Sequence, residues 1–324
     1  MGNAKYRRRR KHSLVRFLSC AAGIFVIVYC CTHYDIADRL GIDKDDYNRV
    51  KSFIKNELSQ KDIYNDESNQ GKIAENILTN RQELSASIYE QIKNGGTGFE
   101  VSFSDGDISA DDVGNEFKKL LNIHPEIFWL TGAASGSGLK VNDVNTYTYE
   151  LETNCDKTGI VNMMGELDIT VNNIVTQAGV YSSEYEKAMY VHDEIVKKCE
   201  YDEETYYGGT ADGLVYTSYG CLVGNRAVCS GYAKAYQLIL NRLGIECGYI
   251  TGEATSDGVT GGHAWNYVKI DGKYSFVDVT WDDPIIIGRN KDDNISHKYF
   301  CISYEEICKD HTFDNSFDTE QFIQ

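Results

Sequence analysis

The strongest constraint on the fold is a pair of alternating segments that flank Asp271 and Gly272 in the C-terminal part of the chain. Residues 261–270 and 273–280 each alternate apolar or aromatic side chains with small or polar ones, the pattern of a half-buried β-strand. An Asp-Gly pair between two such segments is among the strongest short-range signals for a β-hairpin. The sequence therefore predicts a hairpin with a two-residue loop, which fixes the residues that face each other across the two strands.

This register places a histidine and a carboxylate on one face of the sheet. Trp265 faces Asp278, and His263 shares that face because it lies two residues from Trp265. The histidine and the aspartate are then diagonal neighbours, with backbones about 7–8 Å apart and side chains within reach. A carboxylate beside a histidine fixes the imidazole tautomer and stabilises the imidazolium. Asp282 and Asp283 are alternative partners for the histidine, but they follow the strand beside a proline, where a role in a turn is favoured.

A cysteine lies upstream of this hairpin, at the start of a predicted helix. Residues spaced by about one helical turn follow Cys229 until Gly244 ends the pattern, namely Tyr232, Tyr236, Ile239 and Leu243. The N-terminus of a helix offers unsatisfied N–H groups and the positive end of the dipole, which stabilise a thiolate. Position alone does not separate a reactive cysteine from a packing residue, because most buried cysteines are inert.

Three segments of the sequence, in this order along the chain, carry a resemblance to a known family. They are residues 219–233 (YGCLVGNRAVCSGYA), 262–266 (GHAWN) and 277–284 (VDVTWDDP). A nucleophile, a base and an orienting carboxylate are the parts of covalent acyl transfer, and here they follow the order Cys, His, Asp. Over about residues 180–300 the chain resembles the transglutaminase-like superfamily, in its secreted or membrane-anchored bacterial form.

The resemblance implies both a fold and the roles of three residues. The fold is α+β, with a papain-like transglutaminase core and an N-terminal α+β accessory region. In that core, the helix bearing the cysteine packs on an antiparallel sheet bearing the histidine and the aspartate. The implied roles are nucleophile for Cys229, base for His263 and orienting residue for Asp278. Cys221 stands where the family more often has a small residue, so its disulfide and redox behaviour stays open.

Other residues near these motifs are candidates for a substrate cleft. Trp265 and Trp281 either wall the cleft or pack in the core. The backbone N–H of Cys229 is expected to form part of the oxyanion hole, and Asn225 is a candidate side-chain donor. The sequence has no C-x-x-C pair and no Cys/His spacing typical of zinc, so neither a metal nor a cofactor is predicted.

The other histidines of the body do not form a recognisable site in the sequence. His192 lies on the apolar stripe of a predicted helix, which favours a packed position in the core. His124 lies in a turn before a proline, and His297 and His311 lie in the polar C-terminal region. For these three the sequence predicts no nearby ligand partner.

The remaining patterns predict how the chain is organised. Helices are expected at 73–92, 113–121 and 182–199, strands at 99–103, 146–151 and 167–171, and a Gly-rich turn at 132–138. Four parts follow: a basic N-terminus with a signal anchor (1–34), a polar helical stem and hinge (35–71), an accessory α+β region (72–178) and a transglutaminase-like catalytic domain (179–324).

The N-terminal segment separates two regions of opposite charge. Residues 1–34 hold seven basic residues and no acidic one, while the chain has 32 basic and 49 acidic residues, so the remainder carries a net charge of −24. Such a body repels phosphate backbones, which argues against nucleic acid as a partner. The apolar run at 17–31 after the basic cluster predicts an uncleaved signal anchor, a single transmembrane helix with the acidic body extracellular. A cleaved signal peptide with secretion, or a soluble apolar terminus, is the alternative.

The predicted function is extracellular, cysteine-dependent acyl transfer at an amide through a thioester, with a protein or peptide substrate that includes cell-wall-associated material. Hydrolysis by a peptidase or deamidase is slightly favoured over amine cross-linking. The alternative is a non-catalytic cell-surface module that uses the same fold for binding or adhesion. Seven of the ten cysteines lie outside the apolar run and its border, and an odd number predicts at least one free thiol.

Overall fold

A computed structural model of the chain describes residues 77–78, 81–104, 108–141, 143–206, 213–283, 295–314 and 317–322. The predicted signal anchor and the predicted stem both lie outside the described residues. Within the described part, no helix is both long enough and apolar enough to cross a membrane. Residues 76–324 group into one compact unit.

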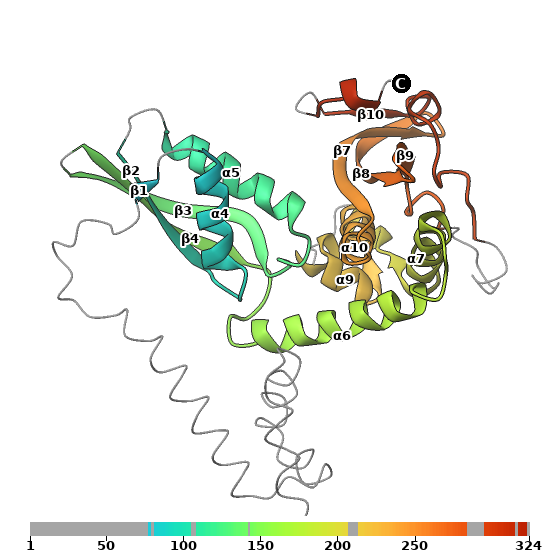
Figure 1. Ribbon diagram of the computed structural model, residues 1–324, viewed down its shortest axis with the longest axis horizontal. Coiled ribbons are helices and arrows are strands. Elements are labelled where there is room, and N and C mark those ends of the chain that lie inside the picture. Colours follow the sequence, from blue (N-terminus) through green and yellow to red (C-terminus); the bar gives the residue numbers. More distant parts are fainter. Residues whose placement is uncertain are drawn as a thin grey trace, which may run out of the picture. The chain divides into compact units, whose positions relative to one another are not determined.

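The first part of this unit is a four-stranded sheet with two helices packed on it (Figure 1). The strand order is β1-β2-β4-β3, and the elements are β1 (Ile77–Leu78), α4 (Arg81–Ile92), β2 (Gly98–Phe103), α5 (Ala110–Ile123), β3 (Leu130–Val141) and β4 (Val144–Thr153). Helix α5 begins with a capping box, in which Ser109 and Asp112 each accept a backbone N–H of the other. Its apolar face is buried through Val113, Phe117 and Leu120.

Three local predictions in this region differ from the structure. The helix expected at 73–92 begins only at Arg81, and Ile77–Leu78 within that range form strand β1. The expected turn at 132–138 lies inside strand β3, where the missing side chain of Gly136 leaves room for the ring of Tyr149 on the neighbouring strand. The expected strand at 167–171 lies inside helix α6 (Ile160–Ala178). Leu167 and Val171 are buried one helical turn apart while Ile169 between them is 60% exposed, so the short alternation belonged to a longer helical period.

The second part holds a central helix on an antiparallel sheet. Helix α10 packs on strands β7 and β8 and also contacts α6, α7 and α9 (Figure 1). The elements are α7 (Glu184–Lys198), β5 (Glu200–Tyr201), α8 (Glu203–Tyr206), η3 (Gly213–Tyr216), α9 (Ser218–Leu222), β6 (Arg226–Ala227), α10 (Cys229–Arg242), β7 (Glu246–Ser256), β8 (Val259–Ile270), β9 (Lys273–Val277), α11 (Tyr304–Ile307), β10 (His311–Phe313) and η5 (Glu320–Phe322). The sheet order is β10-β7-β8-β9. The predicted α+β class and the helix-on-sheet core are confirmed.

The hairpin has the predicted register. Strands β8 and β9 are antiparallel, with Ile270 opposite Lys273 and Asn266 opposite Val277. Asp271 and Gly272 have φ angles of 49° and 79°. Two consecutive residues with positive φ are the signature of a type I′ turn, whose twist matches that of the strands it joins.

Candidate active site

Cys229 is the first residue of helix α10 and is half-buried. The helix is able to start there because Gly231, in its first turn, has no side chain. A Cβ at Gly231 would lie 2.7 Å from the carbonyl oxygen of Val215 and 3.0 Å from that of Thr217. The preceding chain can therefore pass close to the helix start, and the thiol sits where the helix dipole favours negative charge.

His263 lies between the thiol and a buried carboxylate. Its Nε2 is 2.7 Å from Oδ2 of Asp278, and the ring also forms a hydrogen bond with Cys229. Because Nε2 is taken by Asp278, Nδ1 is the ring nitrogen left for the thiol. The structure thus brings together the cysteine, histidine and aspartate that the sequence singled out, on α10, on β8 and just after β9.

The carboxylate of Asp278 is fully buried and accepts hydrogen bonds from several donors. Its Oδ1 accepts from the backbone N–H groups of Thr280 and Trp281, at 3.0 and 3.2 Å. Burial alone would raise the pKa of Asp278, but the charge and hydrogen bonds of His263 and His311 hold it well below its usual range. The group is therefore ionised at any physiological pH.

The imidazole of His263 responds in the opposite direction. Burial of the ring acts to lower its pKa, but the charge and hydrogen bond of Asp278, with the hydrogen bond of Cys229, raise the pKa to about 10. The imidazole of His263 thus lies between a carboxylate and the sulfur of Cys229.

His311 is a second histidine on the same carboxylate, and the prediction that it has no nearby partner is wrong. Its Nε2 lies 3.1 Å from Oδ2 of Asp278, and its Nδ1 lies 2.7 Å from Oδ1 of Asp310. The hydroxyl of Tyr299 donates to the other oxygen of Asp310 at 2.6 Å. Oδ2 of Asp278 is thus shared by two histidines, His263 next to the thiol and His311 further along the chain.

Strand β10 brings His311 into place, and this depends on Gly252 of β7. His311 is the first residue of β10, which pairs with β7. Gly252 faces His263 on one neighbouring strand and Phe313 on the other. A Cβ at Gly252 would lie 1.9 Å from the carbonyl oxygen of Thr312, so only glycine lets β10 lie this close.

An open cleft of about 760 Å³ lies beside His263. Its lining is polar and largely acidic, with Asp257, Asp283 and Asp310 set against a single described lysine, Lys298. Among the candidate cleft residues, Trp281 lines the cleft and its ring centroid is 5.4 Å from that of His263.

The other two cleft candidates are placed elsewhere. Trp265 is 1% exposed and packs in an apolar cluster beside Phe276 and Phe313. Asn225 is exposed, has a φ of 55°, and its side-chain amide donates to the carbonyl oxygen of Val223 within its own loop. Neither residue is among those that line the cleft.

The two alternative aspartates have other partners. Asp282 is buried and accepts hydrogen bonds from the hydroxyl of Ser296 and the backbone N–H of Tyr299. Asp283 accepts a hydrogen bond from the hydroxyl of Tyr232 at 2.7 Å. The partner of His263 is thus Asp278. Free thiols include Cys247, Cys301 and Cys308 as well as Cys229.

The part of the chain that holds this site is similar to a known protein family. Residues 173–279 match the family described as the transglutaminase-like superfamily, a stretch that contains Cys229, His263 and Asp278. Over this stretch the chain is similar to a superfamily of cysteine-dependent catalytic proteins. A search of curated proteins found no match.

Three solved structures show similarity to parts of the chain. One is a TGase, at 16% identity and a TM-score of 0.33, with 76% of this chain and 63% of that chain covered. Another is a candidate cysteine protease from Cytophaga hutchinsonii, at 17% identity and a TM-score of 0.30, with coverages of 47% and 63%. A third is a candidate protease from Parabacteroides distasonis, at 12% identity and a TM-score of 0.23, with coverages of 55% and 39%. The chain spans less than two thirds of the length of each of these structures.

Proposed function

We propose that this protein is a cysteine-dependent enzyme that transfers an acyl group from an amide of a protein or peptide. Cys229 is the nucleophile, His263 the general base and acid, and Asp278 the residue that orients the imidazole. The observation that supports this most directly is the position of His263, which bonds to the thiol on one side and to Asp278, at 2.7 Å, on the other. This is the arrangement that activates a thiol for attack on a carbonyl.

The proposed reaction has two halves. In the first, the thiolate of Cys229 attacks the amide carbonyl carbon, and a C–S bond forms as the C–N bond breaks. Nδ1 of His263 gives its proton to the leaving amine, while the carboxylate of Asp278 keeps the ring oriented through Nε2. The backbone N–H of Cys229 at the helix start stabilises the oxyanion. In the second half, His263 takes a proton from the incoming water or amine, which attacks the thioester and releases the thiol.

Water is the favoured acceptor of the acyl group. The cleft beside His263 is open to solvent and most of its lining residues are polar or charged, so water reaches the imidazole that would activate it. The three carboxylates of the cleft favour substrates that carry positive charge near the reacting amide. The proposal is therefore hydrolysis of a glutamine-type or peptide amide in a substrate with basic residues. A pure binding module is the competing function.

The alkylation rate of Cys229 across pH tests the proposed ion pair. With iodoacetamide and peptide mapping by mass, Cys229 is expected to react rapidly already near about pH 6, where an ordinary thiol of pKa about 8.5 is almost wholly protonated. The pKa of His263 is raised to about 10, so the imidazolium stays charged both near pH 6 and at the pKa of an ordinary thiol, about 8.5. Exposed Cys308 serves as the reference thiol in the same molecule.

Two variants complete this measurement. His263→Ala removes the cation, so the rate at Cys229 should fall toward that of Cys308 near about pH 6. Lys298→Ala removes a cation that lines the same cleft but does not touch the thiol, and it should leave the rate high. If Cys229 reacts no faster than Cys308 in the unaltered protein, the catalytic proposal fails and a binding function becomes the one to pursue.

We propose further that the acidic body is held outside a membrane by the N-terminal segment. The support is the sequence alone, in which a basic cluster precedes the apolar run at 17–31. Protease added to intact expressing cells should digest the body, and the full chain should resist extraction from membranes by alkaline carbonate. Val26→Lys places a charge at the centre of the run, at a cost of about 3 kcal/mol to insertion, and should release the protein. A body that is protected from protease until the cells are lysed contradicts this orientation.

A further inference from the structure

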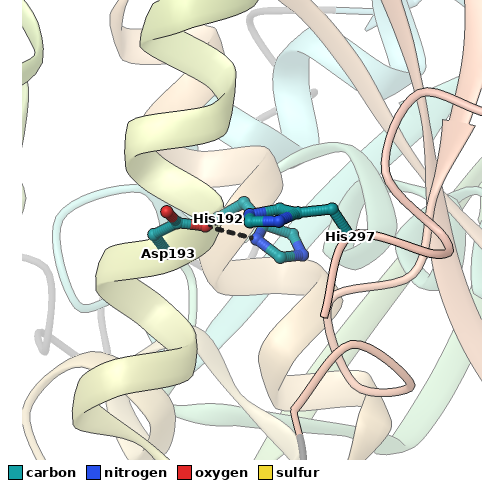
Figure 2. Close-up of side chains that lie close together, drawn as sticks. All are labelled: His192, Asp193 and His297. Carbon is teal, nitrogen blue, oxygen red and sulfur yellow. Dashed lines mark hydrogen bonds and ion pairs between the residues drawn. The ribbon is translucent and has the colours of Figure 1, made fainter. Parts of the chain in front are cut away.

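Two histidines and an aspartate meet away from the candidate active site (Figure 2). His192 and Asp193 lie on helix α7, and His297 lies on residues 295–300, called the C-terminal segment below. Nδ1 of His192 lies 3.0 Å from Oδ1 of Asp193, and Nε2 of His297 lies 2.8 Å from the same oxygen. One ligand atom from each residue lies within 4.8 Å of the others. The sequence did not indicate this cluster, because His297 is 104 residues from Asp193.

The inner histidine of the cluster is fixed from behind. His192 is fully buried and packs on Phe300, with ring centroids 5.3 Å apart. Its Nε2, the nitrogen that faces away from the cluster, lies 3.3 Å from Oδ2 of buried Asp282. Asp282 is itself held by the hydroxyl of Ser296 at 2.6 Å and by the backbone N–H of Tyr299.

This arrangement matches the surroundings of a metal-binding histidine. A ligand histidine almost always donates its second ring N–H to a carboxylate, a backbone carbonyl or a water, which fixes the tautomer and leaves the other nitrogen for the metal. Here Asp282 is the carboxylate next to Nε2 of His192, at an ion-pair distance of 3.3 Å and without an aligned hydrogen bond. The outer ligands are more accessible, since the side chains of Asp193 and His297 are 24% and 38% exposed. An ion can therefore enter from solvent, with its inner ligand held in place.

We propose that His192, Asp193 and His297 bind a divalent transition-metal ion of the zinc class. Imidazole and carboxylate ligands suit zinc, and three protein ligands leave one position for water. Tetrahedral zinc with bonds of about 2.0–2.1 Å places its ligand atoms about 3.3 Å apart, so the contacts of 3.0 and 2.8 Å need to widen by about 0.3 and 0.5 Å. The ion would tie helix α7 to the C-terminal segment, from which the hydroxyl of Ser296 and the backbone N–H of Tyr299 hold Asp282.

The site also touches the turn that carries the candidate orienting residue. The backbone N–H of Asp282 donates to the carbonyl oxygen of Asp278 at 3.2 Å. Metal binding would therefore stiffen this turn as well as the contact between α7 and the C-terminal segment. The inference does not depend on the proposed acyl transfer, because a binding module with this fold would hold the same ion.

The test is zinc binding by the full chain after removal of metals with a chelator. The titration uses Zn²⁺ alone against a chromophoric competitor, in a Cys229→Ala background that removes the reactive thiol. One ion per chain should bind, and the melting temperature should rise with zinc concentration. Co²⁺ in place of Zn²⁺ should give the visible bands of nitrogen and oxygen ligands without the near-ultraviolet band of thiolate ligands.

Three variants assign the binding to this site. The side chain of His297 is partly exposed, so the variant His297→Gln should fold. It should lose the bound ion, and zinc should no longer raise its melting temperature. Asp282→Asn should weaken zinc binding by about 10- to 100-fold, the effect of losing a partner behind a ligand. His124→Gln alters a histidine that pairs with Glu126 elsewhere, and it should bind zinc as the parent does. Absence of binding in the parent chain, or undiminished binding by His297→Gln, would overturn the proposal.

Discussion

Replacement of Cys229 by alanine is expected to abolish turnover and to leave the fold intact. The variant has no atom that can form the thioester, so the rate of amide hydrolysis should fall by roughly 10⁴-fold or more. Ammonia or amine release from a library of glutamine-containing peptides measures this loss. The free energy of unfolding should change by less than about 1 kcal/mol, because Cys229 is only half-buried and alanine is well tolerated in a first helical turn.

A second cysteine supplies the matched control. Cys247 on β7 is fully buried, and burial raises its pKa well above that of a free thiol, so it stays protonated and unreactive. Cys247→Ala should therefore lower stability through the lost packing and keep the peptide-amide activity. If Cys229→Ala hydrolyses peptides at the parent rate, the nucleophile is another residue and the proposed mechanism is wrong.

The candidate site was readable from the sequence wherever its geometry is local. The two-residue loop at Asp271 fixes the register of β8 and β9, and that register brings His263 within reach of Asp278. The start of α10 at Cys229 followed from helical spacing after it. In both cases, residues close in the sequence determine the backbone that carries the side chain.

The remaining parts depend on contacts that the sequence pattern does not carry. His311 reaches Asp278 from 33 residues away, and it does so because Gly252 lets strand β10 lie against β7. His297 meets α7 in the same non-local way. The wrong prediction of a strand at 167–171, inside α6, has a different cause. Five alternating residues fit both the period of a strand and that of a helix, and only the burial of positions one turn apart separates the two.

The second large effect is expected from Asp278→Asn. The carboxylate accepts hydrogen bonds on one oxygen from His263 and His311, and on the other from two backbone N–H groups. Asparagine has one oxygen and one NH₂ group. Either the two histidines or the two backbone N–H groups must therefore face a donor where they faced an acceptor. If the NH₂ group faces His263, the ring takes the tautomer with its proton on Nδ1, which cannot accept the proton of the thiol. The value of kcat should fall by roughly 10³- to 10⁴-fold.

The same substitution should also cost stability, in a way that depends on pH. Breaking a buried pair of charges typically costs about 3–5 kcal/mol. The pKa of His263 is raised to about 10, so its contribution to stability is complete below the unfolded value of about 6.5 and fades as the pH rises toward 10. The pKa of Asp278 is depressed, so its contribution is present above the unfolded value of about 3.9 and fades in acid. The gap in melting temperature between parent and variant should thus be widest between about pH 4 and 6.5.

Calorimetry across this range, with Asp282→Asn as the matched control, separates catalysis from packing. Asp282 is also buried and accepts hydrogen bonds, but its partners are Ser296, Tyr299 and His192 and not the histidine beside the thiol. Asp282→Asn should therefore lose stability and keep most of its kcat, whereas Asp278→Asn should lose both. Equal loss of kcat in the two variants would mean that Asp278 acts only by holding the fold. A gap in melting temperature that widens above pH 7 would mean that His263 is not the charged partner of Asp278.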